Sequence, residues 1–170
     1  MIRSIVWALG ILGVLLLLQT TLLSYVVVAG TKPDVLLVVF VILATINGSF
    51  ASQIVGFILG LIIDMVSLAP LGFHAFIFSL AGYIFGLGRG KVYFDPLVMP
   101  ALLGFLATIY YTITGFLLSF VFRLGYPWNS WFHMGLVFQM VLNILLTPLV
   151  LWLNSWIREQ FQNPRRGFGG

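Results

Sequence analysis

Residues 56–72 read GFILGLIIDMVSLAPLG and contain one carboxylate, Asp64, in an otherwise apolar run. Gly56 and Gly60 precede the aspartate at intervals of four residues, and Pro70 and Gly72 follow it. Residues four apart lie on one face of a helix, while a proline and a glycine close together favour a turn. The stretch therefore predicts an apolar helix with a small-residue face, which ends in a sharp turn just after a buried acid.

The composition of the whole chain places this helix in a membrane. Of the 170 residues, 61% are hydrophobic and 7% are charged, and the mean hydropathy is +1.14. A chain with so little charge cannot cover a water-soluble surface. Because a helix needs about 20 apolar residues to cross the bilayer, the length allows about six spans and leaves no room for a soluble domain. The predicted fold class is all-α, a six-transmembrane-helix bundle with short second and third spans.

Six apolar segments, separated by polar or turn-forming residues, are the expected spans. They cover residues 4–28, 33–46, 50–68, 71–87, 97–122 and 131–157. Pro33 and Asp34 open the second span, because proline is tolerated in the first turn of a helix and an acid there faces the positive end of the helix dipole. Asn47, Gly48 and Ser49 form the turn between the second and third spans.

The distribution of basic residues orients the spans. Lys and Arg near helix ends accumulate on the cytoplasmic side of a membrane. With six spans and a cytoplasmic N-terminus, Lys32 and Arg123 lie outside and the other six of the eight basic residues lie in the cytoplasm. Joining the second and third spans into one helix would reverse this bias. We therefore expect one membrane domain, residues 1–170, with both termini cytoplasmic and a tail of residues 158–170.

Small and polar residues form stripes at helical spacing on the later spans as well. The stripes include Gly82 in residues 71–87, Gly104 in residues 97–122, and Gly135, Gln139 and Asn143 in residues 131–157. Helices in lipid associate through close backbone approach at small residues and through side-chain hydrogen bonds. Three interpretations stay open: packing within the chain, a pocket for a small polar molecule, and docking of a partner's transmembrane helix. The pocket would be lined by Thr108, Thr112, Gln139 and Asn143.

The spans offer little for catalysis or metal binding. Deep in them, the ionisable residues that membrane enzymes usually cluster are limited to Asp64 and His74. His74 and His133 show no metal-binding spacing, and the chain has no cysteine. We therefore expect no enzyme activity, no catalytic residue, no cofactor and no metal. Membrane lipids are expected partners, and nucleic acid is not.

The residue pattern resembles the MreD family of rod shape-determining membrane proteins. The resemblance rests on the chain length, on a short second span opened by Lys32, Pro33 and Asp34, and on the pattern of Gly56, Gly60, Asp64, Pro70 and Gly72. It covers the first four spans best. The resemblance implies a non-enzymatic scaffold subunit of the elongation machinery in the bacterial cytoplasmic membrane, which supports lateral-wall peptidoglycan synthesis and cell shape.

The resemblance also implies partners. MreC, bound through its transmembrane helix, is the first of these. The MreB filament, the glycosyltransferase RodA and its class B penicillin-binding protein are direct or indirect partners. The MreD fold is similar to that of the substrate-binding membrane subunits of energy-coupling-factor transporters. The alternative function is therefore that of a binding subunit for a small solute, with Gln139 and Asn143 donating to the ligand.

Asp64 needs a compensating partner, because it lies in the last turns of its helix, where the dipole disfavours an anion. At 1.5 Å per residue it lies about 22 Å across the membrane from Ser49, in the outer leaflet. The candidate cations on that side are His74, Lys32 and Arg123. The other candidates are Ser67 and the backbone N–H groups that begin the fourth span. In each case we expect Asp64 to fix the corner between the third and fourth spans.

Overall fold

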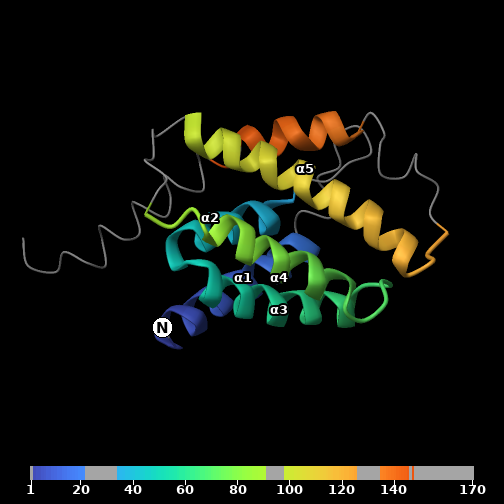
Figure 1. Ribbon diagram of the computed structural model, residues 1–170, viewed down its shortest axis with the longest axis horizontal. Coiled ribbons are helices and arrows are strands. Elements are labelled where there is room, and N and C mark those ends of the chain that lie inside the picture. The colour runs from blue at the N-terminus through green and yellow to red at the C-terminus, as the bar shows by residue number, and fades with distance from the viewer. Residues whose placement is uncertain (1, 22–33, 91–97, 126–134, 146, 148–170) are drawn as a thin grey trace, which may run out of the picture.

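The computed structural model describes residues 2–21, 34–90, 98–125, 135–145 and 147 (Figure 1). The described residues form six helices. These helices are α1 (Ile2–Thr21), α2 (Val35–Asn47), α3 (Ser49–Val66), α4 (Phe73–Gly86), α5 (Val98–Val121) and a sixth helix, Gly135–Leu145. The predicted all-α class is confirmed. The described residues do not include Pro33 or the tail of residues 158–170. They also leave out residues 22–28 of the expected first span and residues 131–134, 146 and 148–157 of the expected last span.

The helix limits follow the apolar segments of the sequence closely. Both ends of α2, α3, α4 and α5 lie within two residues of the predicted limits. Two helical segments, Ser49–Val66 and Ala101–Val121, are long and apolar enough to cross a membrane. Shorter apolar segments are Ile5–Thr21, Val35–Asn47, Phe73–Gly86 and Gly135–Leu145. α2 has 13 residues, so it is about 20 Å long, less than the thickness of the hydrocarbon core. The six-span topology with both termini in the cytoplasm stays a prediction.

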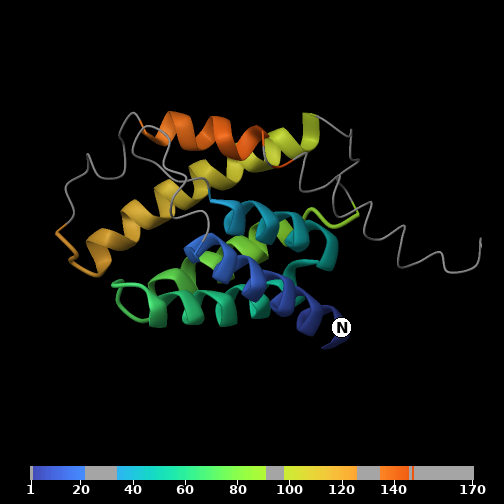
Figure 2. The same cartoon turned by 180° about the vertical axis from the view of Figure 1, so that it is seen from behind.

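The helices form two layers (Figure 1). α1 to α4 make up one layer, and α5 lies with the sixth helix in the other; the view from behind shows the same division (Figure 2). α2 occupies the centre, since nine of its 13 residues are buried. Its sequence is apolar on every side, as is typical of a helix surrounded by others. The core around it takes Leu12 from α1, Leu59 from α3, Phe78 from α4 and Ala107 from α5.

Candidate functional site

Glycines on both α3 and α4 bring the two backbones into contact. A Cβ atom added at Gly56 would lie 2.3 Å from a carbonyl oxygen of α4, and one at Gly60 would lie 2.4 Å from an α4 Cα. From the other side, a Cβ at Gly82 would lie 2.4 Å from a carbonyl oxygen of α3. No side chain fits at such distances, so the glycines are what allows this helix pair to pack so tightly.

Asp64 lies at the end of this contact face and caps α4. The residue is buried, with 3% of its surface exposed. Its Oδ2 accepts hydrogen bonds from the backbone N–H of Gly72 at 2.9 Å and of Ala75 at 3.2 Å. Its Oδ1 accepts one from the backbone N–H of His74 at 2.9 Å and lies 2.8 Å from Nδ1 of the same residue. The carboxylate therefore occupies the positive end of the α4 dipole, where an anion is stabilised.

Both kinds of partner considered for Asp64 take part, the histidine ring and the backbone amides. Pro70 and Gly72 shape the turn that brings the α4 amides to Asp64. The carbonyl of Pro70 accepts from the N–H of Phe73 at 3.1 Å, and Gly72 adopts a φ of +98°. Ser67 does not contribute, because its hydroxyl accepts from the backbone N–H of Ala69. Lys32 lies outside the described residues, and the ion pair found within them is that of Asp64 with His74.

A second polar cluster surrounds Asp34, the N-cap of α2. The Oδ1 atom of Asp34 accepts from the backbone N–H of Leu37 at 3.0 Å and from Nε2 of Gln19 at 3.3 Å. The Oε1 atom of Gln19 in turn accepts from the backbone N–H of Leu36 at 2.8 Å. Gln19 thus acts together with Asp34 to satisfy the first amides of α2. Gln19 was not among the predicted residues, although a polar amide side chain within the apolar segment of α1 could have indicated a buried hydrogen bond.

Asn143 connects this cluster to the other layer. Its Oδ1 accepts from the backbone N–H of Asp34 at 3.1 Å, and its Nδ2 donates to Oγ1 of Thr108 at 3.0 Å. Asn143 is fully buried. Its amide is therefore engaged on both sides by groups of the chain itself, which differs from the predicted role as a donor to a ligand. Gln139 is half-buried and Gly135 is buried in the same helix.

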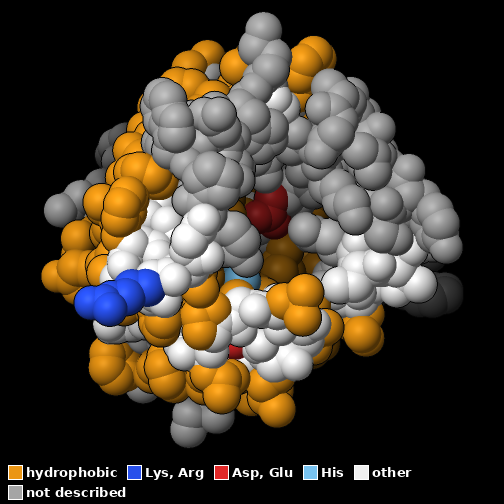
Figure 3. Space-filling view, turned by 90° about the vertical axis from the view of Figure 1, so that its right-hand side faces the viewer, with side chains coloured by type: hydrophobic (Ala, Val, Ile, Leu, Met, Phe, Trp, Pro, Cys, Tyr) orange, Lys and Arg blue, Asp and Glu red, His pale blue; other side chains and the backbone are white. Residues whose placement is uncertain are grey.

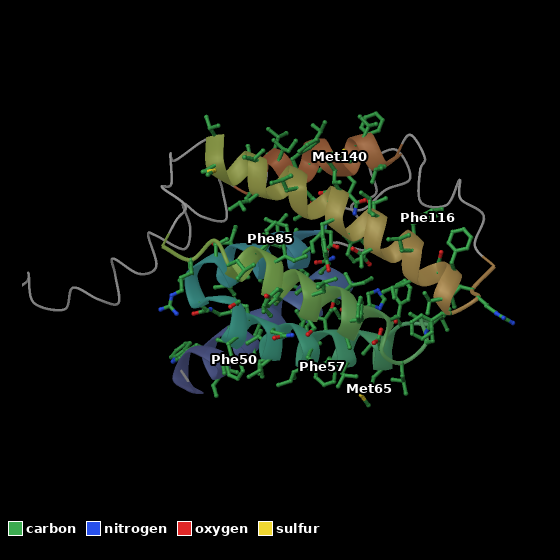
Figure 4. All side chains as sticks on the ribbon, viewed as in Figure 1. Phe50, Phe57, Met65, Phe85, Phe116 and Met140 are labelled. Atoms are coloured by element: carbon green, nitrogen blue, oxygen red, sulfur yellow. The ribbon has the colours of Figure 1, made fainter. Side chains whose placement is uncertain are left out.

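Gly104 also packs against another helix of the same chain. A Cβ there would lie 2.3 Å from Oγ1 of Thr147 and 2.9 Å from the carbonyl oxygen of Asn143. The stripes of α5 and the sixth helix therefore pack against each other. Large side chains cover the outside instead: Phe50, Phe57 and Met65 of α3 point away from the bundle in Figure 4 and are 62%, 51% and 78% exposed.

A hollow opens at the end of the molecule formed by the α3–α4 turn and the end of α5 (Figure 3). Acidic and histidine side-chain atoms are visible inside it, and the described surface below it carries both hydrophobic side chains and polar or backbone atoms. Among the described residues, no group of three or more His, Asp or Glu side chains is placed to hold a metal ion.

Comparison with known proteins places these features in a family. Neither the curated proteins nor the solved structures gave a match. The family model described as rod shape-determining protein MreD matches residues 1–158, a range that includes all the described helices and both polar clusters. The chain therefore belongs to the MreD family, which functions in determining the rod shape of the cell.

Proposed function

We propose that this protein is a multi-pass scaffold subunit of the rod complex in the bacterial cytoplasmic membrane. In this role it has no enzymatic activity and supports lateral-wall peptidoglycan synthesis by binding MreC. It contacts MreB, RodA and the class B penicillin-binding protein directly or through MreC. Membership of the MreD family supports the role in cell shape, and six spans with both termini cytoplasmic are the topology that its basic residues favour.

The packing of the small-residue stripes narrows the surfaces that MreC can use. Gly82 lies against α3, and Gly104 lies against the sixth helix. Neither glycine offers a surface to a partner, although both had been expected as docking positions. A transmembrane helix of MreC therefore has to bind elsewhere, on large side chains or at the end of the bundle.

The observation that carries the proposal is the hollow in Figure 3. Acyl chains cannot form hydrogen bonds, so a polar hollow at membrane depth is poorly matched by lipid alone. A polypeptide segment offers apolar side chains together with amide groups, and so suits a hollow whose interior is polar and whose described surroundings mix hydrophobic and polar groups. We assign this hollow to the transmembrane helix of MreC and the residues next to it.

Crosslinking tests this assignment directly, because the chain contains no cysteine. Leu71, on the α3–α4 turn, and Phe122, at the end of α5, are 70% and 37% exposed on the two elements that border the hollow. Single cysteines at these positions should crosslink to cysteines scanned along the MreC helix. Met65 points away from the bundle at the same end of α3 and is the matched control. Equal crosslinking from Met65, or failure of MreC to copurify from detergent, would contradict the proposal.

The same hollow favours one alternative, a binding subunit for a small solute. Acidic and histidine side chains inside a hollow could bind a polar ligand, although Asn143 is already engaged within the chain. Thermal unfolding of the purified protein against a panel of vitamins separates the two functions. A ligand-dependent rise in the unfolding midpoint supports the solute-binding subunit. Genes for MreB and MreC next to this gene support the scaffold, whereas genes for an ATPase and a coupling subunit do not.

A further inference from the structure

Arg123 closes α5 in a conformation that normally belongs to glycine. The N–H of Leu124 donates to the carbonyl of Ser119 at 3.0 Å, and the N–H of Arg123 donates to that of Phe120 at 3.1 Å. This pair of bonds is the Schellman motif, in which the residue after the helix is left-handed and usually glycine. Arg123 has a φ of +51° and is the one non-glycine residue with positive φ among the described residues. The arginine is thus present at a position where its backbone is strained.

Among the described residues, the charge of Arg123 has no acidic partner. The sequence contains four acidic residues. Asp34 and Asp64 are engaged in the two polar clusters, and the proposed topology places Asp95 and Glu159 on the cytoplasmic side. Arg123 takes no part in the ion pair found among the described residues. In Figure 3, basic side-chain atoms project outward at this end of the molecule, away from the acidic atoms in the hollow. An anion that pairs with Arg123 must come from outside the chain.

A cavity of about 280 Å³ lies beside this arginine, lined by Ser119, Phe120, Arg123 and Gly125. Phe120 is 68% exposed and supplies an apolar wall. The hydroxyl of Ser119 already donates to the carbonyl of Phe116 at 2.6 Å, so the guanidinium is the side-chain donor of the cavity. A planar guanidinium binds two oxygens of one phosphate in a fork, as an ammonium group cannot.

We propose that Arg123 binds the phosphate of an anionic phospholipid in the outer leaflet, with an acyl chain of the lipid along Phe120. This inference rests on the proposed topology and goes beyond MreC binding. α5 has 24 residues, so it is about 36 Å long, more than the roughly 30 Å of the hydrocarbon core. A residue just past its end reaches the level of the phosphates. An exposed aromatic ring and a cation within one turn match the boundary between acyl chain and headgroup better than they match a folded protein surface.

The test uses the full chain in nanodiscs of phosphatidylcholine, alone or with an equal part of phosphatidylglycerol. Native mass spectrometry measures which lipids stay bound, and thermal unfolding measures the midpoint. We expect the protein to retain phosphatidylglycerol about fivefold better than phosphatidylcholine. Arg123→Gln should remove this preference, and Arg123→Lys should keep only part of it, because lysine lacks the fork. Arg89→Gln, which removes one charge at the opposite end of the molecule, should change it less than Arg123→Gln does.

Arg123→Gly separates the side chain from the backbone. Glycine relieves the strained φ, so this variant should unfold at a higher temperature than the original protein in phosphatidylcholine alone, while gaining nothing from phosphatidylglycerol. Equal lipid preference in the original protein and in Arg123→Gln would overturn the proposal. So would a rise in midpoint produced by inorganic phosphate in phosphatidylcholine nanodiscs and lost in Arg123→Gln, because the ligand would then be a free anion. Copurification with MreC is measured separately on Arg123→Gln, so failure of the lipid proposal is distinguished from failure of the scaffold proposal.

Discussion

Replacing Asp64 by alanine removes the hydrogen-bond acceptor of three backbone N–H groups at the start of α4. Three backbone N–H groups, those of Gly72, His74 and Ala75, lose the carboxylate that they contact at 2.9–3.2 Å. The His74 ring loses its partner at 2.8 Å. The side chain of Asp64 is fully buried, whereas that of His74 is 14% exposed. Water can therefore reach the ring in the variant more easily than it can reach the amides.

The expected loss of stability follows from these contacts. A buried N–H without an acceptor costs about 1–3 kcal/mol, and breaking a buried pair costs about 3–5 kcal/mol. We expect Asp64→Ala to lower the free energy of unfolding by about 4 kcal/mol, since water entering at the exposed turn replaces part of the lost bonding. Asp64→Asn keeps one oxygen but turns an NH₂ group toward two N–H donors, so a loss of about 2 kcal/mol is expected. His74→Ala leaves the carboxylate with its three backbone N–H donors, so the pair is lost without leaving an uncompensated charge and the cost should be only about 1 kcal/mol.

Unfolding in mixed micelles with increasing denaturing detergent gives these free energies. Ser52→Ala is the matched control, because Ser52 lies on the same helix, is 3% exposed and makes only a long bond of 3.4 Å to a carbonyl. The control should lose less than about 1 kcal/mol. If Asp64→Ala loses no more than Ser52→Ala does, the carboxylate does not brace the corner. If Asp64→Ala restores rod shape in cells lacking the original gene as well as the original does, the corner is not needed for the complex.

Three further predictions test the packing, the second cluster and the turn between α2 and α3. Gly60→Ala places a Cβ 2.4 Å from the α4 backbone and should cost about 1–3 kcal/mol by thermal unfolding; Gly13→Ala, which meets nothing within 4 Å, should cost nothing. Asn143→Leu removes the acceptor of the Asp34 N–H, so the free energy of unfolding should fall by about 2 kcal/mol. Adding Thr108→Val should cost little more, and full additivity in a double-mutant cycle would argue against a shared network. Gly48→Ala, at a φ of +89°, should cost about 1–2 kcal/mol in the same unfolding assay.

Local sequence signals predicted the helices and the α3–α4 corner well. Apolar segments and their breaks gave the limits of α2 to α5 to within two residues. The spacing of Gly56, Gly60 and Asp64 identified a face on which all three residues now lie against α4. These predictions succeeded because helix periodicity and turn chemistry depend on residues close together in the chain. A carboxylate at the end of one helix and amides at the start of the next are neighbours for the same reason.

The second cluster could not be predicted in this way. The N-cap role of Asp34 follows from its local sequence, but its backbone N–H donates to Asn143, which is 109 residues away. No spacing within a helix indicates which of several polar residues on other helices will meet it. Thr108 and Asn143 were candidates for lining a pocket, but the hydrogen bond between them depends on how the two layers lie against each other.

The small-residue stripes show why sequence alone cannot separate packing within a chain from packing between chains. Both kinds of contact require glycine for the same reason, the absence of a Cβ. What separates them is the identity of the atom that a Cβ would meet, and at Gly56, Gly60, Gly82 and Gly104 that atom belongs to this chain. With these faces filled, partner binding falls to the surfaces that internal packing leaves open. The polar hollow at the end of the bundle is such a surface, and Asp64, which caps α4 at that end, lies on the contact face that Gly56 and Gly60 form.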